Sequence, residues 1–255
     1  MSTNQPLILS GKPIAKKILM RTRESVQSGD HEVGLCVVQV GSVEESSIYV
    51  ARKESRAQRL GFMSTTLNLP EDITEDALLE QLQRLNQNPC IHGILVQLPL
   101  PKHIDSQRIL DSVNSNKDVD GFHPINSGLL SQGRPRFIPC TPKGVMEILR
   151  HYQIELSGKH AVVVGRSNIV GRPMAQLLEQ ENCTVTVCHS RTVDLPSHLK
   201  MADIVVAAVG IPNMIQGTWL KQGVVIIDVG INRLETGGIV GDVHYASAIQ
   251  VASAI

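Results

Sequence analysis

The sequence predicts an α/β fold divided into two domains. Its 255 residues suit two domains of about 100 to 150 residues each better than a single one. Apolar runs rich in β-branched residues recur between stretches of helical periodicity, which is the rhythm of a parallel sheet covered by helices. A stretch rich in glycine and proline, from Asp118 to Pro139, lies between the two halves.

Six apolar runs are predicted to be strands. They are Val33–Val40, Ile91–Leu98, His160–Val164, Thr184–Val187, Ile204–Val209 and Val224–Val229. Two of them, Ala161–Val164 and Ile204–Val209, are apolar throughout, as expected for strands that are buried on both faces. Helices should therefore cover both faces of the sheet.

Two helices have clear starting residues. Thr74 is a predicted N-cap, with Glu75 and Asp76 in the first turn, where the helix dipole favours anions. Thr141 is a second predicted N-cap, with Pro142 at the first helical position. The second of these helices is expected to connect the two domains.

The segment from Asp118 to Pro139 carries few helical or strand signals, so we place the domain boundary in or beside it. The predicted domains are residues 1–124, an N-terminal α/β domain, and residues 125–255, a Rossmann-type parallel-sheet domain. No internal repeat or low-complexity tract is present.

The composition argues against several classes of protein. Lys plus Arg (24) equals Asp plus Glu (24), so the chain has no basic excess and we expect no nucleic-acid partner. No apolar run reaches the roughly 18 to 20 residues that span a bilayer, and the first residues do not resemble a signal peptide. We therefore expect a cytoplasmic protein without a membrane partner.

The five cysteines are odd in number and form no C-x-x-C pair. Neither a disulfide framework nor a zinc knuckle is favoured, and no metal site is predicted. We interpret the cysteines as reduced and mostly core residues.

A glycine-bounded turn follows the strand that ends at Val164. Gly165 and Gly171 stand at its two ends, with Arg166 and Ser167 between them, and Met174–Leu178 reads as a helix. Such a strand, turn and helix allow a pyrophosphate to approach main-chain N–H groups at a helix N-terminus. Two glycines are less specific than a full G-x-G-x-x-G, so a purely structural turn is the alternative.

The end of the next strand favours NADP over NAD. An NAD site commonly carries Asp or Glu at this point for the ribose hydroxyl, whereas Cys188–Thr192 offers Ser190, Arg191 and hydroxyl groups. Arg166 lies beside the neighbouring turn, although either arginine alone could be an ordinary solvated charge. Ile231 follows a further strand, where it could pack on a nicotinamide or donate its main-chain N–H.

Ser46, Tyr49 and Lys53 share one face of a predicted helix, Ser46–Leu60, because they are spaced by three and four residues. The alternative is a lysine that is merely solvated. Gln97 ends an apolar strand and needs a polar partner, unless it faces solvent at a sheet edge.

Two carboxylates, Asp118 and Asp120, stand beside Gly121. Either one could simply be a turn residue, so these positions do not by themselves predict a ligand.

Taken together, six motifs in order resemble the bifunctional methylenetetrahydrofolate dehydrogenase/cyclohydrolase family. They are Ser46-x-x-Tyr-x-x-x-Lys53, Gly93-Ile-x-Val-Gln-Leu-Pro-Leu-Pro101, Lys117-Asp-Val-Asp-Gly-Phe-His-Pro124, Cys140-Thr-Pro142, Gly165-Arg-Ser-Asn-Ile-Val-Gly-Arg-Pro173 and Ile227-Asp-Val-Gly-Ile-Asn232. They span nearly the whole chain.

The resemblance implies an enzyme that oxidises 5,10-methylenetetrahydrofolate with NADP and hydrolyses the methenyl product to 10-formyltetrahydrofolate. It implies that Lys53 is catalytic, that Tyr49 packs on the folate, that Gln97 holds Lys53 and that Asp120 binds the pterin. The cofactor contacts that it implies are Gly165, Arg166, Ser167, Ser190 and Ile231. It also implies a homodimer joined through the cofactor domains.

Two features depart from the family pattern. The loop Gly41-Ser-Val-Glu-Glu45 lacks the Asp-Asn-Pro-like sequence common there. Family members normally continue beyond the position of Ile255 with a Thr-Pro-Val-Pro-Gly-Gly-Val-Gly-Pro segment and a final helix, which we expect to have been trimmed from the sequence.

Two other classes of protein share part of this pattern. A short-chain dehydrogenase also combines Ser, Tyr-x-x-x-Lys and a glycine-rich NADP turn, but there the turn precedes the Tyr-Lys pair, whereas here Tyr49 precedes Gly165. A catalytically silent folate- or nucleotide-binding scaffold is the second reading, and the presence of Lys53, Gln97 and Asp120 opposes it.

Overall fold

The computed structural model describes residues 5–29, 32–41 and 44–255, with main chain only for residues 44–49 and 51. The chain forms two compact units, one of residues 15–138 and one of residues 1–14 together with 139–255. The chain passes between the two units at residues 14 and 15 and again at residues 138 and 139, whereas the sequence suggested a single division at residues 124 and 125. The second crossing lies in the glycine- and proline-rich stretch.

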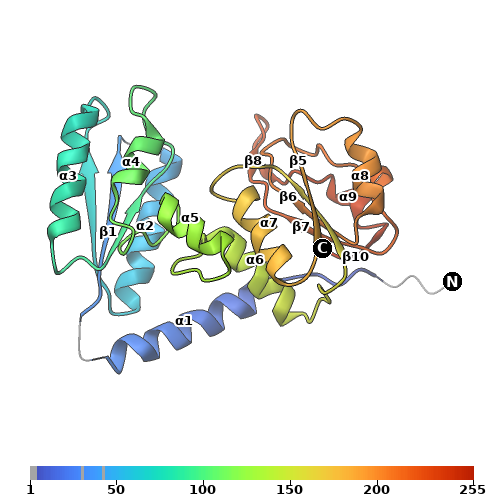
Figure 1. Cartoon of the computed structure of the whole chain (residues 1–255), viewed down its shortest axis with the longest axis horizontal. Helices are drawn as coiled ribbons and strands as arrows, with labels where there is room; N and C mark the ends of the chain where they lie inside the picture. Colours follow the sequence, from blue (N-terminus) through green and yellow to red (C-terminus); the bar gives the residue numbers. More distant parts are fainter. Residues whose placement is uncertain (1–4, 30–31, 42–43) are drawn as a thin grey trace. The chain divides into compact units, whose positions relative to one another are not determined.

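The unit of residues 15–138 is built on a three-stranded parallel sheet in the order β2-β1-β3. Its elements are α1 (Lys12–Gln27, which begins in the other unit), β1 (Gly34–Val40), α2 (Glu44–Arg59), β2 (Met63–Leu69), α3 (Glu75–Gln87), β3 (Gly93–Val96), α4 (Ser106–Ser112) and α5 (Pro124–Ser131). Helices α2 and α3 lie on opposite sides of the sheet (Figure 1). Cys36 and Val38 of β1 pack with Leu78 and Leu82 of α3 and with Ile109 of α4 in one buried cluster. That cluster holds the sheet against α3 and α4 and so supports the positions of the residues at its carboxyl edge.

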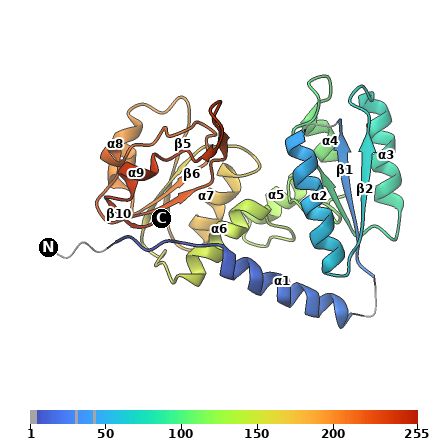
Figure 2. The same ribbon diagram turned by 180° about the vertical axis from the view of Figure 1, so that it is seen from behind.

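The other unit contains a five-stranded parallel sheet in the order β10-β7-β6-β4-β5. Its elements are α6 (Cys140–His151), β4 (His160–Val164), α7 (Gly171–Gln180), β5 (Thr184–Cys188), α8 (Leu195–Met201), β6 (Ile204–Ala207), a 3₁₀ turn (Gly217–Trp219), β7 (Val224–Asp228), β8 (Asn232–Arg233), β9 (Ile239–Val240), α9 (Tyr245–Ala248) and β10 (Ala252–Ala254). Helices α6 and α7 lie on one side of this sheet and α8 and α9 on the other, as Figures 1 and 2 show. Strands β4 and β6 are fully buried along most of their length.

The first residues of the chain complete this second unit. Leu7 and Leu9 donate their N–H groups to the carbonyls of Ser253 (2.9 Å) and Ile255 (2.8 Å), and Ile255 donates to Leu7 (2.9 Å). The N-terminal segment thus covers the β10 edge of the sheet in parallel register. Because unpaired strand edges are exposed to unwanted pairing, this segment protects one of the two edges.

The predicted fold class is confirmed, and the six predicted strands are present with small shifts at their ends. The N-cap at Thr74 is also confirmed, since its hydroxyl accepts the N–H of Ala77 at 3.3 Å. The predicted N-cap at Thr141 is wrong, because α6 begins at Cys140, two residues before the predicted first helical residue Pro142, and Pro139 is its cap. Of the cysteines, three are buried and two, Cys90 and Cys140, are exposed.

Two further elements depart from the predictions. The segment expected to lack regular structure contains α5, whose first turn combines Pro124 at the first helical position with the His123 ring as cap. Strand β2 was not predicted, because it is half exposed and carries Ser64, Thr65 and Thr66 in place of a continuous apolar run. Within the described residues, no helix is long and apolar enough to cross a membrane.

Replacing Leu9 with proline should destabilise the C-terminal unit, because proline cannot donate to the carbonyl of Ile255. We expect a loss of about 1 to 2 kcal/mol in the free energy of unfolding. Trp219 is the single tryptophan of the chain and packs against the core of this unit, so its fluorescence during urea unfolding reports the change.

Ile8→Pro is the matched control, because the N–H of Ile8 makes no hydrogen bond within the described structure. Equal loss in both variants would show that the N-terminal pairing is not what stabilises this edge.

Candidate active site

The carboxyl edge of the N-terminal sheet gathers three of the predicted functional residues. Gln97 directly follows β3, and its N–H donates to the carbonyl of Val38 in β1 (2.8 Å). A parallel bridge pairs Ile94 with Asp118, so the segment that continues to Asp120 runs in the same direction as β3. Asp120 therefore arrives at the edge where Gln97 lies, which is where open parallel sheets bind their ligands.

Lys53 reaches this edge from helix α2. It lies three residues after Val50 and four before Ala57, both of which are buried, so its stem shares the face of α2 that packs on the sheet. Its ammonium group donates to Oε1 of Gln97 at 3.1 Å. A charged group that is partly buried needs such a partner, and the predicted pairing of Lys53 with a strand-end amide is present.

The Gln97 side chain is itself fixed. Its Nε2 donates to the carbonyl of Leu98 at 2.7 Å, which assigns nitrogen and oxygen within the amide and turns Oε1 towards Lys53. The bond from Lys53 therefore meets an acceptor whose orientation is already set.

Asp118 and Asp120 have different environments although they are two residues apart. Asp118 is buried and accepts N–H bonds from Gly121 (3.1 Å), His123 (2.9 Å) and the Asn126 amide (2.8 Å). Asp118 is thus a turn-forming residue, which was one of the two interpretations that the sequence allowed. The Asp120 carboxylate accepts no hydrogen bond from the described residues, so it is available to a ligand.

Burial raises the pKa of Asp120 to about 6, with the charge of Lys53 opposing the rise and that of Asp118 adding to it. An exposed aspartate titrates near 3.9. The protonated carboxyl is therefore favoured by folding, and this contribution to stability is fully present at acidic pH and is lost as pH rises through about 6. Near neutral pH the carboxylate predominates, at some cost in stability.

Tyr49 belongs to α2, one turn before Lys53. Its side chain and that of Ser46 lie outside the described residues, so their predicted placement beside Lys53 stays a prediction.

The C-terminal unit has a pocket of about 470 Å³ at the carboxyl ends of β4, β5 and β6. The strand order places β4 between β5 and β6, so the pocket lies at the topological switch point, the usual ligand position in such sheets. Its lining residues are Val164, Gly165, Arg166, Ser167, His189, Ser190, Thr192, Leu195, Ala208, Val209, Ile211 and Met214. No acidic side chain is among them.

The turn after β4 requires its two glycines. A Cβ on Gly165 would lie 2.1 Å from the carbonyl oxygen of Ala208, and one on Gly171 would lie 2.2 Å from that of Gly165. Gly165 also has φ near +122°, which disfavours other residues. The glycines thus let the turn pack closely against the residue after β6 and let the start of α7 pack against the turn itself.

Ser167 shapes the same turn through its hydroxyl, which accepts the N–H groups of Val170 (3.2 Å) and Gly171 (3.4 Å). Its own proton remains free to be donated to a ligand oxygen. After β5, the N–H of His189 donates to the Thr192 hydroxyl (2.8 Å), which closes a tight turn that carries Ser190.

Four of the five predicted cofactor residues therefore line one pocket, namely Gly165, Arg166, Ser167 and Ser190. Ile231 does not line it. It lies on the loop between β7 and β8 with 65% of its surface exposed.

Sequence reasoning missed Asp242, a fully buried carboxylate that binds the loop after β6. The sequence signal for it was weak, since a Gly-Asp-Val tripeptide is compatible with an ordinary turn.

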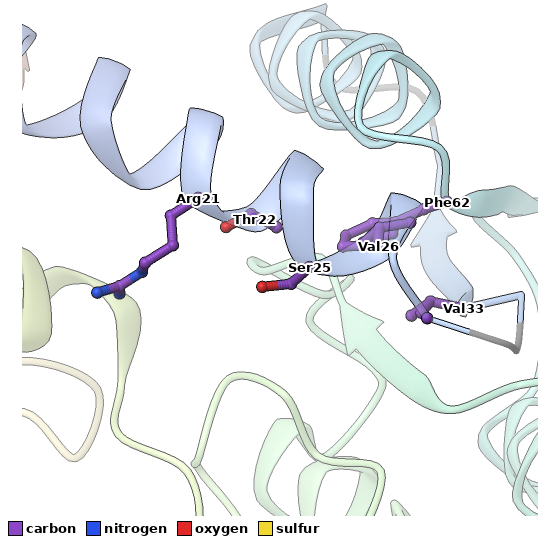
Figure 3. A pocket seen from close by; sticks show the side chains of 7 residues that line it. Arg21, Thr22, Ser25, Val26, Val33 and Phe62 are labelled. Carbon is purple, nitrogen blue, oxygen red and sulfur yellow. The ribbon is translucent and has the colours of Figure 1, made fainter.

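Another hollow, of about 420 Å³, lies in the N-terminal unit away from this chemistry. Figure 3 shows Arg21, Thr22, Ser25 and Val26 of α1 around it, with Val33 and Phe62. Val33 and Phe62 precede β1 and β2, so this hollow is at the amino edge of the sheet, opposite the edge of Gln97. The described residues also contain no cluster of three side chains able to hold a metal ion.

Comparison with known proteins covers both units. Residues 9–120 match the family described as tetrahydrofolate dehydrogenase/cyclohydrolase, catalytic domain, and residues 139–255 match its NAD(P)-binding domain. The bifunctional protein FolD 2 of Geobacter sulfurreducens is 50% identical over 251 residues, 97% of this chain and 88% of the relative. The bifunctional protein FolD of Pelobacter propionicus is 51% identical over 255 residues, 97% and 89% of the two chains.

Solved structures agree with these matches. The bifunctional FolD enzyme of Campylobacter jejuni gives a TM-score of 0.94 at 45% identity, covering 97% of this chain and 89% of that one. The Trypanosoma brucei methylenetetrahydrofolate dehydrogenase-cyclohydrolase, complexed with NADP cofactor and inhibitor, gives 0.91 at 36% identity, with coverage of 98% and 89%.

Replacing Lys53 with methionine should raise the pKa of Asp120 above about 6, because the charge of Lys53 now opposes the effect of burial. A ¹³C NMR titration of the aspartate carboxyl carbons measures this directly. Lys117→Met is the control: the Lys117 ammonium donates to the carbonyls of Leu85 and Asn88 and does not contribute to the pKa of Asp120. A pKa of Asp120 that stays the same in Lys53→Met would contradict the described proximity of the two groups.

Proposed function

The chain belongs to the tetrahydrofolate dehydrogenase/cyclohydrolase family, and from that premise we propose that Lys53, Gln97 and Asp120 carry its reactions. It is a bifunctional enzyme of one-carbon folate metabolism, which oxidises 5,10-methylenetetrahydrofolate with NADP and hydrolyses 5,10-methenyltetrahydrofolate to 10-formyltetrahydrofolate. The main observation behind the proposal is the hydrogen bond from Lys53 to Gln97, close to an Asp120 carboxylate that accepts no hydrogen bond from the described residues.

Asp120 is proposed to bind the amino-pyrimidine edge of the pterin. Its carboxylate has no hydrogen-bond donor among the described residues, and its ionised form can accept paired N–H bonds, which are charge-assisted and directional. A ligand that donates these bonds would also stabilise the carboxylate that burial disfavours. Tyr49 is proposed to pack on the folate ring from the preceding turn of α2.

The pocket of the C-terminal unit fits NADP. Its lining includes the basic Arg166 and no acid, which suits a ribose 2′-phosphate, and Ser190 can donate to the same group. The Ser167 hydroxyl offers a donor to the pyrophosphate, and the positive end of the α7 dipole favours an anion nearby. We propose that Ile231 contacts the nicotinamide from the neighbouring loop. When bound, NADP supplies the acceptor for the hydride.

The oxidation needs no nucleophile from the protein, so the contribution of these residues is to hold the reactants in position. Hydrolysis needs a proton carrier. We propose that the Lys53 amine takes one proton of the water that adds to the methenyl carbon and gives it to the ring nitrogen as the bond between that nitrogen and the carbon breaks. The remaining hydroxyl proton of the adduct is released to solvent as the formyl C=O forms. Gln97 accepts one N–H of Lys53. This bond holds the Lys53 nitrogen so that its remaining hydrogens and its lone pair can face the substrate.

We also propose a homodimer joined through the C-terminal units. Strand β5 is an edge strand of its sheet, and no other strand of the described residues pairs with its outer side. Val187 of this strand is an exposed apolar side chain. A mass of one chain by light scattering would contradict this. The cytosol is the proposed compartment, in keeping with cysteines that form no disulfide among the described residues.

Lys53→Met should reduce hydrolysis of added methenyltetrahydrofolate by about 10² to 10⁴-fold, because the relay of protons is lost. Dehydrogenase activity should fall less, since hydride transfer does not need the amine. Absorbance of methenyltetrahydrofolate follows both reactions. Lys53→Arg keeps the charge but cannot act as a base, so it should not restore hydrolysis. Hydrolysis by Lys53→Met at the wild-type rate would rule out Lys53 as the proton carrier.

The dehydrogenase should use NADP⁺ with a higher kcat/KM than NAD⁺. Arg166→Ala should lower this ratio by about 10-fold or more, as expected for a hydrogen bond to a charged group. Arg172→Ala is the control, because Arg172 is an exposed arginine outside the lining of the pocket. An unchanged ratio in Arg166→Ala would exclude Arg166 from the 2′-phosphate site.

A further inference from the structure

Asp242 lies at the centre of a buried network in the C-terminal unit. It follows β9 in the segment Gly241–Val243, and none of its surface is exposed. Its Oδ2 accepts the N–H groups of Val209 (2.7 Å) and Gly210 (3.1 Å). Its Oδ1 accepts the N–H of Ile211 (3.0 Å) and the amide of Asn232 (2.9 Å).

These four bonds join the loop after β6, which lines the pocket, to Asn232, which directly follows Ile231. Three successive N–H groups, from Val209 to Ile211, converge on one carboxylate and form an anion-binding nest in the main chain. Val209 and Ile211 line the pocket. Asn232 is the first residue of β8 and ends the loop that carries Ile231. A single side chain thus determines both the wall of the pocket and the position of the loop that carries Ile231.

The place of Asp242 is determined in turn by its neighbours. Asp228, at the end of β7, accepts the N–H groups of Asp242 (3.0 Å) and Val243 (2.9 Å). Gly230 passes so close that a Cβ there would lie 2.3 Å from Oδ1 of Asp242. The segment also pairs through its main chain, because Ile215 donates to the carbonyl of Asp242 (3.0 Å).

A fully buried carboxylate is costly unless hydrogen bonds replace its water. Here four donors do so, and the three main-chain N–H groups that turn towards Asp242 would otherwise have no partner among the described residues. Buried carboxylates that organise loops in this way can be purely structural, but this one acts on the two loops at which the cofactor is proposed to bind.

We propose that Asp242 is a positioning residue for NADP: by holding the loop of Val209–Ile211 and the side chain of Asn232, it sets the wall of the pocket and the loop of Ile231 before the cofactor arrives. This rests on the proposed NADP site. It predicts that Asp242 affects NADP binding and hydride transfer, and not the hydrolysis of methenyltetrahydrofolate, which does not consume NADP.

Asp242→Asn tests the proposal, because the amide keeps the size of the carboxylate but presents N–H groups to main-chain donors. Calorimetry should show a dissociation constant for NADP raised by about 10-fold or more, the effect expected of lost bonds to a charged group. The KM for NADP should rise and kcat for the dehydrogenase should fall. Hydrolysis of added methenyltetrahydrofolate should stay within about twofold of wild type, since the proton chemistry is assigned elsewhere.

Asp203→Asn is the matched control. Asp203 also accepts a main-chain N–H, that of His160 (2.9 Å), and it binds Lys221 (2.6 Å), but it precedes β6 and so lies at the amino edge of the same sheet. This variant should bind NADP as wild type does.

Two results for a folded Asp242→Asn would overturn the proposal: NADP affinity equal to wild type, or equal losses of NADP binding and hydrolysis. The proposed cofactor site is tested separately, since it fails only if the wild-type chain itself does not bind NADP.

Hydrogen exchange on the wild-type chain provides the second measurement if Asp242→Asn does not fold. The amides of Val209, Gly210 and Ile211 should exchange more slowly than those of residues 235 and 236, which make no main-chain hydrogen bond within the described structure. NADP should slow the three amides further. Unprotected amides, or amides that do not respond to NADP, would overturn the proposal.

Discussion

Parallel strands bring all their carboxyl ends to one edge of a sheet, and both groups of functional side chains depend on that constraint. In the N-terminal unit, the central strand β1 has β2 and β3 on its two sides, and Gln97 and Asp120 leave the sheet at its carboxyl edge. In the other unit, strand β4 has β5 and β6 beside it, and the pocket opens where these three strands end. Residues far apart in sequence, such as Gln97 and Asp120, thus reach the same edge of a sheet because of strand direction, and Lys53 joins them from helix α2.

Carboxylates at these edges divide into two kinds according to their hydrogen bonds. Asp118 and Asp242 are buried and surrounded by N–H donors, so their charge is already used in fixing loops. Asp120 interacts electrostatically with both Asp118 and Lys53, and no hydrogen-bond donor among the described residues reaches it. The nearby hydrogen-bond donors go to Asp118, which leaves the Asp120 carboxylate available to a ligand. The cost is visible in the pKa of Asp120, which burial raises to about 6.

The sequence was sufficient for the fold class and for the six apolar strands, because continuous β-branched runs have few alternatives in a soluble chain. It could not locate β2, whose serine and threonine residues suit a half-exposed strand and a loop equally well. It placed Lys53 and Gln97 on elements that the structure joins by a hydrogen bond. The role of Asp242 could not be predicted from the sequence. Its carboxylate accepts three N–H groups that lie more than thirty residues earlier in the chain, and no local sequence pattern encodes such a long-range contact.

We propose that folate binds at Lys53, Gln97 and Asp120 and that NADP binds at the pocket at the carboxyl ends of β4, β5 and β6. A crystal structure of the chain with NADP and a non-reactive folate analogue would show both ligands. We expect the pterin to lie against Asp120 with its one-carbon position facing the Lys53 nitrogen, and the 2′-phosphate to lie beside Arg166 and Ser190. A pterin bound in the hollow of Arg21 and Phe62, or an Asp120 carboxylate without contact to the pterin, would rule out the proposed folate site.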